Sequence, residues 1–180
     1  PIPKGEDVAA AVAVPLIEAV KGGKVQVFLP TGRTMEVKIP AGIEDGKQIR
    51  LRGQGHPSHY GGETGDAIVT VRIAPHPLFR IDGRDLRADL PVTLYEAVLG
   101  GAIDVPTLDG RVELTIPPNS NGGRTLRLRG KGLPAATSGA TPGDLYVSLK
   151  IVLPETPAPD LEALMKQWKA KKLYQPRKAL

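Results

Sequence analysis

The chain contains an internal repeat of about 78 residues, and this repeat limits what the chain can fold into. Residues 39–53 begin with Ile-Pro and end with Arg-Leu-Arg-Gly, and residues 116–130 do the same. The pair Gly-Asp at 65–66 returns at 143–144, in the same order and at nearly the same offset. Ordered matches of this kind indicate a duplicated fold unit. The 180 residues are therefore predicted to form two similar small units.

Composition excludes several classes of protein. With 41% hydrophobic and 24% charged residues, the chain has the composition of a soluble globular protein. No apolar run approaches the roughly 18 residues of a membrane span, and the run at 8–14 lacks the basic segment of a signal peptide. There is no Cys and there are only three His, so we expect no disulfide, no metal site and no cofactor. The absence of Cys fits a cytoplasmic protein. Because the chain begins at Pro1 without an initiator Met, we interpret it as a fragment or a processed chain.

Alternating apolar residues predict a mainly β fold. Val8, Val12 and Val14 alternate with alanines, which gives a strand with one inward face and an unusual all-alanine outer face. Helical turns are expected at 16–21 and 94–99. Further strands are expected at 25–29, 34–39, 47–51, 67–73, 86–90, 102–105, 112–116, 125–128 and 145–152.

Near the C-terminus the spacing of apolar residues changes from that of a strand to that of a helix. Apolar residues at helical spacing predict an amphipathic, basic helix that Asp160 caps and that ends before Pro176. Its apolar stripe is Leu161, Leu164, Met165 and Trp168.

Catalytic chemistry is not indicated. Ser58 lies between His56 and His59, but the Gly-rich loop around them offers nothing to hold a nucleophile and a base within hydrogen-bond reach. The glycine pairs precede strands and do not open helices as a phosphate-binding loop would. We therefore expect a binding protein and not an enzyme.

The net charge of +5 leaves nucleic acid open as a partner. Much of the excess lies in the tail after residue 165, where a run of lysines is typical of a solvated face. DNA binding is the alternative function, and it would add association with the nucleoid.

An ordered set of short motifs resembles the C-terminal region of DnaJ-type J-domain co-chaperones over nearly the whole chain. The motifs are Lys-Gly-Glu-Asp-Val at 4–8, Leu-Ile-Glu-Ala-Val-Lys-Gly at 16–22, Ile-Pro-Ala-Gly at 39–42, Gly-Asp at 65–66, His-Pro-Leu-Phe-Arg at 76–80, Asp-Gly-Arg-Asp-Leu at 82–86 and Gly-Asp-Leu at 143–145.

The resemblance implies an architecture. It implies two tandem β-sandwich-like domains with short helices, C-terminal domain I at 6–80 and C-terminal domain II at 81–155. The first would bind unfolded protein clients for a DnaK-type chaperone. A C-terminal helix and tail at 156–180 would form a homodimer.

Two absences narrow the resemblance. Family members with a zinc-binding domain carry Cys pairs inserted near residues 29–33, and this chain has a tight turn and no Cys there. It therefore resembles the zinc-free class B, or curved-DNA-binding, branch. The His-Pro-Asp motif of a J domain is also absent. This chain alone is expected to hold clients without stimulating the ATPase of DnaK.

The resemblance also implies binding residues, each with a plain structural alternative. The family's client pocket maps by position onto Val12, Val14, Val27, Leu29 and Phe79, which could equally be core. The helical stripe Leu161, Leu164, Met165 and Trp168 would make dimer contacts, or it would pack on the second domain.

Overall fold

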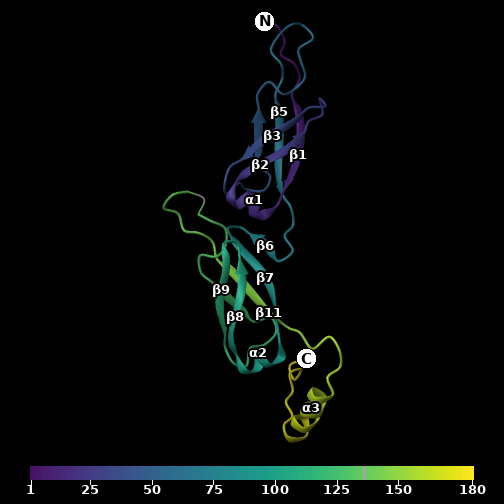
Figure 1. Ribbon diagram of the computed structural model, residues 1–180, viewed down its shortest axis with the longest axis vertical. Coiled ribbons are helices and arrows are strands. Elements are labelled where there is room, and N and C mark those ends of the chain that lie inside the picture. Colours follow the sequence, from purple (N-terminus) through teal and green to yellow (C-terminus); the bar gives the residue numbers. More distant parts are fainter. Residues whose placement is uncertain (136) are drawn as a thin grey trace.

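The computed structural model describes residues 1–135 and 137–180 as two β units followed by a separate helix (Figure 1). The first unit contains β1 (Val8–Val14), α1 (Leu16–Lys21), β2 (Gly23–Phe28), β3 (Thr34–Ile39), β4 (Gln48–Leu51) and β5 (Ala67–Ile73). The second unit contains β6 (Phe79–Asp82), β7 (Asp85–Val92), α2 (Leu94–Leu99), β8 (Gly101–Thr107), β9 (Gly110–Ile116), β10 (Thr125–Leu128) and β11 (Leu145–Ile151). The chain then forms α3 (Pro159–Lys171).

Each unit has two layers of strands. In the first, the sheet order is β1-β5-β4, and the hairpin β2–β3 forms the other layer (Figure 1). β1 runs parallel to β5, with Val8 opposite Ala67 and Val14 opposite Ile73. The inward side chains of both layers form one apolar cluster, which is why alternation in the sequence located these strands.

The second unit repeats this arrangement and adds one strand. Its main sheet has the order β10-β11-β7-β6, and β8–β9 is the facing hairpin. β7 is parallel to β11 in the same register as β1 to β5, with Leu86 opposite Leu145. The additional strand, β6, pairs antiparallel with the first half of β7.

The predicted fold class is confirmed: short strands in small sheets, short helices and a C-terminal helix. The strand β6 was not predicted, and it moves the junction between the units. A boundary after residue 80 would cut β6, whereas the sheet pairing places the junction in residues 74–78.

Residues at the helix ends explain where the helices begin and end. Thr93 caps α2 through a reciprocal capping box with Glu96, and Gly100 ends it with φ 73°. The expected cap of α3 at Asp160 is wrong, because Ala158 is the N-cap and Pro159 occupies the first turn. Asp160 lies in that first turn instead. Among the described residues, no helix is long and apolar enough to cross a membrane.

The two units meet through an apolar contact. Leu16 of α1 is buried in the second unit's cluster together with Phe79 and Leu86, although its neighbour Ala19 belongs to the first unit's cluster. The helix α1 therefore contributes to both cores.

Candidate functional site

Three of the five predicted client-binding residues lie together but are closed off from solvent. Val14, Val27 and Leu29 belong to the first unit's cluster and are 0%, 2% and 4% exposed. Val12 packs against the same cluster and is partly exposed. These residues therefore form part of the apolar core of the first unit and not an open slot.

Phe79 lies elsewhere. It is the first residue of β6, is 5% exposed, and packs in the second unit's cluster. The His76 ring lies 4.9 Å from the Phe79 ring, and His76 Nδ1 accepts hydrogen bonds from the amides of Leu78 and Phe79. The structure thus does not bring Phe79 together with the other four, because β6 is recruited to the second sheet.

The edge formed by β1 and β2 is what the first unit exposes. Val12 on β1 and Val25 on β2 are partly buried members of one cluster, and Phe28 on β2 is 78% exposed. β1 pairs only with β5 and β2 only with β3 in the described chain, so each has an unpaired side. This apolar edge, defined by β1 and β2, is the candidate binding surface.

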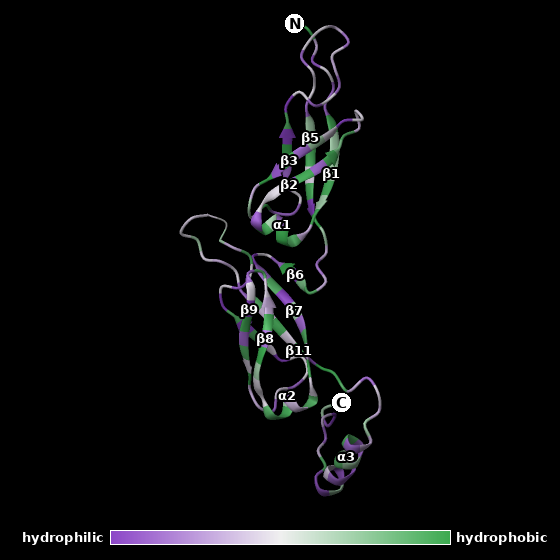
Figure 2. Cartoon of the chain, in the orientation of Figure 1, coloured by the Kyte–Doolittle hydropathy of each residue, from purple (hydrophilic) through white to green (hydrophobic). Residues whose placement is uncertain are grey.

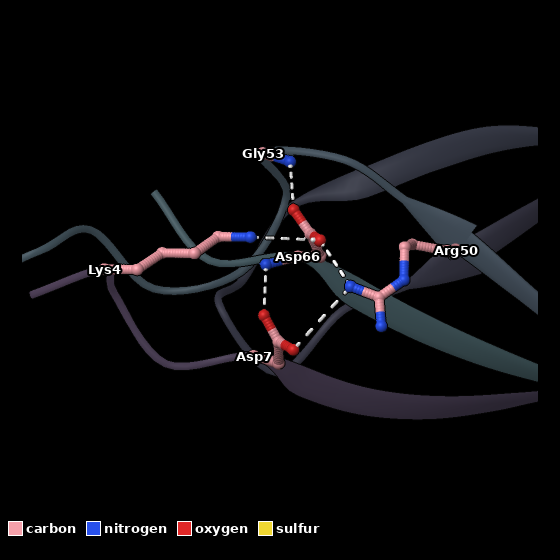
Figure 3. Close-up of polar contacts among 5 residues, drawn as sticks. All are labelled: Lys4, Asp7, Arg50, Gly53 and Asp66. Carbon is pink, nitrogen blue, oxygen red and sulfur yellow. Dashed lines mark hydrogen bonds and ion pairs between the residues drawn. The ribbon is translucent and has the colours of Figure 1, made fainter. Parts of the chain in front are cut away.

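A buried aspartate ties together the segments that enter and leave this unit (Figure 3). Asp66 Oδ1 accepts from the amide of Gly53 at 2.9 Å, and Asp66 Oδ2 accepts from Arg50 Nη1 at 2.6 Å and Lys4 Nζ at 3.3 Å. The amide of Asp66 donates to Asp7 Oδ1 at 2.7 Å. We call these five residues the Asp66 cluster. Arg50 and Lys4 neutralise the carboxylates, and no group of His, Asp or Glu suited to a metal ion occurs in the described residues.

The second unit repeats the Asp66 cluster without the lysine. Asp144 accepts from the amide of Gly130 at 2.8 Å and from Arg127, and its own amide donates to Asp85 Oδ1 at 2.8 Å. The sequence repeated Gly-Asp and Arg-Leu-Arg-Gly, which could have revealed this pairing, but sequence reasoning assigned these motifs no role.

Hydrogen bonding sets the acidity of both aspartates. The Gly53 amide, followed by Arg50 and Lys4, lowers the pKa of Asp66 from its ordinary value to about 2. The Gly130 amide and Arg127 lower the pKa of Asp144 in the same way. These carboxylates are therefore held ionised as structural acceptors and are unsuited to proton transfer near neutral pH.

The apolar stripe of α3 is largely exposed. Leu164, Met165 and Trp168 are 60%, 44% and 48% exposed, and Leu161 is partly exposed. Between α3 and α2 lies an open groove of about 830 Å³, lined by Tyr95, Val98, Leu99, Leu161, Leu164 and Met165 among others. The stripe thus faces the second unit without being buried by it.

Comparison with known proteins assigns the chain to a family. The family model described as the DnaJ C terminal domain matches residues 8–154. The chain belongs to the DnaJ C-terminal domain family. The matched range begins at β1 and ends just after β11, so both repeats of the DnaJ C-terminal domain are included.

Three relatives of this DnaJ C-terminal chain have the same name. The chain is 42% identical over 190 residues to a "Curved DNA-binding protein" of Coxiella burnetii, covering 98% of this chain and 59% of that protein. A protein of the same name from Escherichia coli is 46% identical over 157 residues, covering 87% of this chain and 50% of the relative. One from Pseudomonas putida is 46% identical over 147 residues, covering 82% and 46%. The chain thus spans about half the length of the curated relatives that it matches.

Proposed function

We propose that the chain is the client-binding region of a DnaJ-type co-chaperone, a binding module that holds exposed apolar segments of unfolded proteins. One observation supports this proposal: among the described residues, β1 and β2 of the first unit each have one side without a partner strand, and partly exposed apolar residues lie along them. Unpaired strand edges offer a row of backbone donors and acceptors to any extended chain. Apolar neighbours such as Phe28 and Val12 would add side-chain contacts.

In this proposal the buried residues Val14, Val27 and Leu29 support the binding surface from the core and do not contact the client directly. They hold β1 and β2 side by side, and Val12 gives access to them from the edge. Phe79 acts indirectly, by fixing the junction between the units. In the longer protein, the clients would pass to a DnaK-type chaperone in the cytoplasm.

A homodimer fits the exposed stripe of α3. The groove between α2 and α3 is apolar and open, and the α3 of a second chain would cover Leu164, Met165 and Trp168. Two weak client sites on one dimer would gain affinity through their high effective concentration.

The proposal is tested by aggregation of luciferase diluted from guanidinium chloride, followed by light scattering. The wild-type chain is expected to suppress aggregation at a few equivalents, and Phe28→Ser to suppress it several-fold less. Tyr60→Ser is the matched control, because Tyr60 is 73% exposed and lies in the loop between β4 and β5, not on β1 or β2. If the wild-type chain gives no protection, the proposal is wrong. If Phe28→Ser protects fully, Phe28 lies outside the client surface.

DNA binding is a second candidate, because a cluster of cations lacks acidic partners. Lys166, Lys169, Lys171 and Lys172 are exposed and form no ion pair among the described residues, and the relatives are named for DNA binding. Phosphate contacts release counterions, so the affinity for a DNA duplex should fall steeply with salt. Replacing these four lysines with Gln should flatten that dependence. An affinity that ignores salt would exclude this candidate.

A further inference from the structure

A cavity of about 360 Å³ lies where the two units meet. Ligand pockets in proteins have volumes of about 300–1,000 Å³, so this cavity is large enough to hold a ligand. Leu16, Ala19 and Val20 of α1 form one wall, and Ile81 of β6 contributes from the second unit. Figure 1 shows α1 at the end of the first unit that lies next to β6, and Figure 2 shows hydrophobic residues in both elements. A ligand in this cavity would contact both units.

The walls of the cavity are mainly aliphatic. Its lining includes Ile43, Ile73, Ile81, Val20 and Leu133. Ile81 is 41% exposed, and the other four are half-buried. Because removing apolar surface from water is favourable, these walls favour an aliphatic or aromatic side chain as the ligand.

The first unit contributes to the cavity a loop that the second repeat does not reproduce. The loop from Gly42 to Gly46 follows β3, and the loop from Asn119 to Gly123 follows β9. The first residues of both loops have a positive φ, 76° and 54°, and their amides donate to equivalent carbonyls of α1 and α2 at 3.1 and 3.0 Å. Between these ends the first loop reads Ile-Glu-Asp and the second reads Ser-Asn-Gly. The two loops are thus anchored alike, but only the first carries an apolar residue and two carboxylates.

The cavity is lined by charged residues as well. Asp45 Oδ1 accepts from the amide of Ile73 at 2.7 Å, and Asp45 Oδ2 lies 3.9 Å from Arg72 Nη1. Glu44 is exposed and forms no ion pair among the described residues. Arg84, from the second unit, donates to a backbone carbonyl. The lining residues thus carry two carboxylates and one guanidinium, and Glu44 is the carboxylate that is free to bind a cation.

The two units are joined by apolar contacts and not by strand pairing. Among the residues that the structure describes, no sheet contains strands of both units. Leu16 and Phe79 meet in one apolar cluster instead. A ligand that fills the cavity adds contacts to both units, so its binding would stabilise one relative orientation of the two.

We propose that this cavity binds an aliphatic side chain of a client, and that a neighbouring Lys or Arg of the client pairs with Glu44. This inference rests on the proposed function and adds a second client site, separate from β1 and β2. It also gives that site a preference for an apolar residue next to a basic one. The equivalent loop of the second unit, with Ser-Asn-Gly, offers neither the apolar wall nor the carboxylates.

The first measurement uses three short peptides with blocked termini as probes. Their sequences are Gly-Lys-Leu-Lys-Gly, Gly-Lys-Ser-Lys-Gly and Gly-Glu-Leu-Glu-Gly. Each is titrated into the whole chain, in which the isoleucine δ1 methyl groups are labelled and followed by NMR. The first peptide should shift the methyl groups of Ile43, Ile73 and Ile81, which line the cavity. Those of Ile116 and Ile151, in the core of the second unit, should not move.

The affinities from these titrations test both parts of the preference. Replacing the Leu of the peptide with Ser should weaken binding at least about tenfold, because the apolar contact is lost. Replacing both Lys with Glu should weaken binding at least about fivefold.

A variant of the chain locates the charge that selects the ligand. Glu44→Gln should reduce the preference for Lys over Glu at least about twofold. Glu36→Gln is the matched control, because Glu36 is exposed on β3 of the same unit and does not line the cavity. It should leave the preference unchanged. Thermal melts verify that both variants fold, and the titrations of the wild type do not depend on them.

Each other outcome overturns the inference. If the three cavity methyl groups do not shift, or if the Ser peptide binds as tightly as the Leu peptide, the cavity holds no client side chain. If the Glu peptide binds as tightly as the Lys peptide, or if Glu44→Gln keeps the full preference, Glu44 does not select the ligand. Protection of luciferase in these cases would leave the proposed function intact. If the chain fails to protect luciferase although the three methyl groups shift, the proposed function is wrong, and with it the client as the natural ligand.

Discussion

Leu16 of α1 and Phe79 of β6 come from different repeats but are buried in the same apolar cluster, 2% and 5% exposed. A helix of the first unit thus completes the core of the second. Because small units bury little apolar surface alone, this shared contact is expected to couple their stabilities.

Leu16→Ala should therefore destabilise the second unit as well as the first. Truncating a fully buried Leu costs about 2–4 kcal/mol, because the remaining cavity adds to the lost transfer free energy. Calorimetry should show both unfolding transitions moving to lower temperature. Tyr60→Ala, at a site 73% exposed in the loop between β4 and β5, should change stability by less than about 0.5 kcal/mol. A loss confined to one transition would argue against a shared core.

Acid should weaken the Asp66 cluster. The folded pKa of Asp66 is about 2, below the roughly 3.9 of an unfolded Asp, so the unfolded chain binds more protons between these values. The contribution of Asp66 to stability is thus complete above about pH 4 and is lost as pH falls toward 2. Urea titrations across this range should show a steeper decline for wild type than for Asp66→Asn, whose side chain does not titrate. Parallel curves for the two proteins would contradict this role.

Two glycines should resist replacement by alanine. A Cβ on Gly65 would collide with the backbone of Glu6, and one on Gly143 with the backbone of Arg84. Gly65→Ala and Gly143→Ala should each destabilise by about 3 kcal/mol, because the neighbouring backbone must shift. Gly23→Ala is the control, since a Cβ there meets nothing within 4 Å. Chemical denaturation measures all three, and equal stabilities would contradict the close packing of these loops.

The α3 stripe should control association of chains. Leu164→Glu places a charge on the exposed apolar face, so a homodimer formed through this face should dissociate. Sedimentation equilibrium should then report the mass of one chain. Ala163→Glu, on the opposite face of the helix, adds the same charge and should leave the dimer intact. A wild-type chain that stays monomeric at all concentrations would refute the dimer.

Period-two alternation in the sequence predicted nearly every strand, because each strand has one face toward a core. It could not show which strands pair, so the parallel contact of β1 with β5 came only from the structure. It also missed β6, although this strand is as long as β4 and β10, which alternation did predict. Phe79 was interpreted as part of a pocket because of its motif, whereas its place is set by pairing with β7.

The candidate site shows the same limit. Alternation correctly put Val12 and Val14 on one face of β1, and Val27 of β2 on the same side as Leu29, which follows that strand. Alternation shows which face of a strand turns inward. It does not show whether a second layer of strands covers that face. In a two-layer unit this small, the inward faces of β1 and β2 are the core itself, so Val14, Val27 and Leu29 are not open to a ligand.

The first unit is entered through β1 and left through β5, and these two strands are paired in parallel. Tension between the two ends of this unit therefore pulls β1 and β5 past each other lengthwise. Seven residue pairs along the ladder then share the load at once, instead of opening one after another. Mechanical unfolding is governed by the rate of this rupture, so the first unit should stay folded under a pull that would peel a hairpin apart.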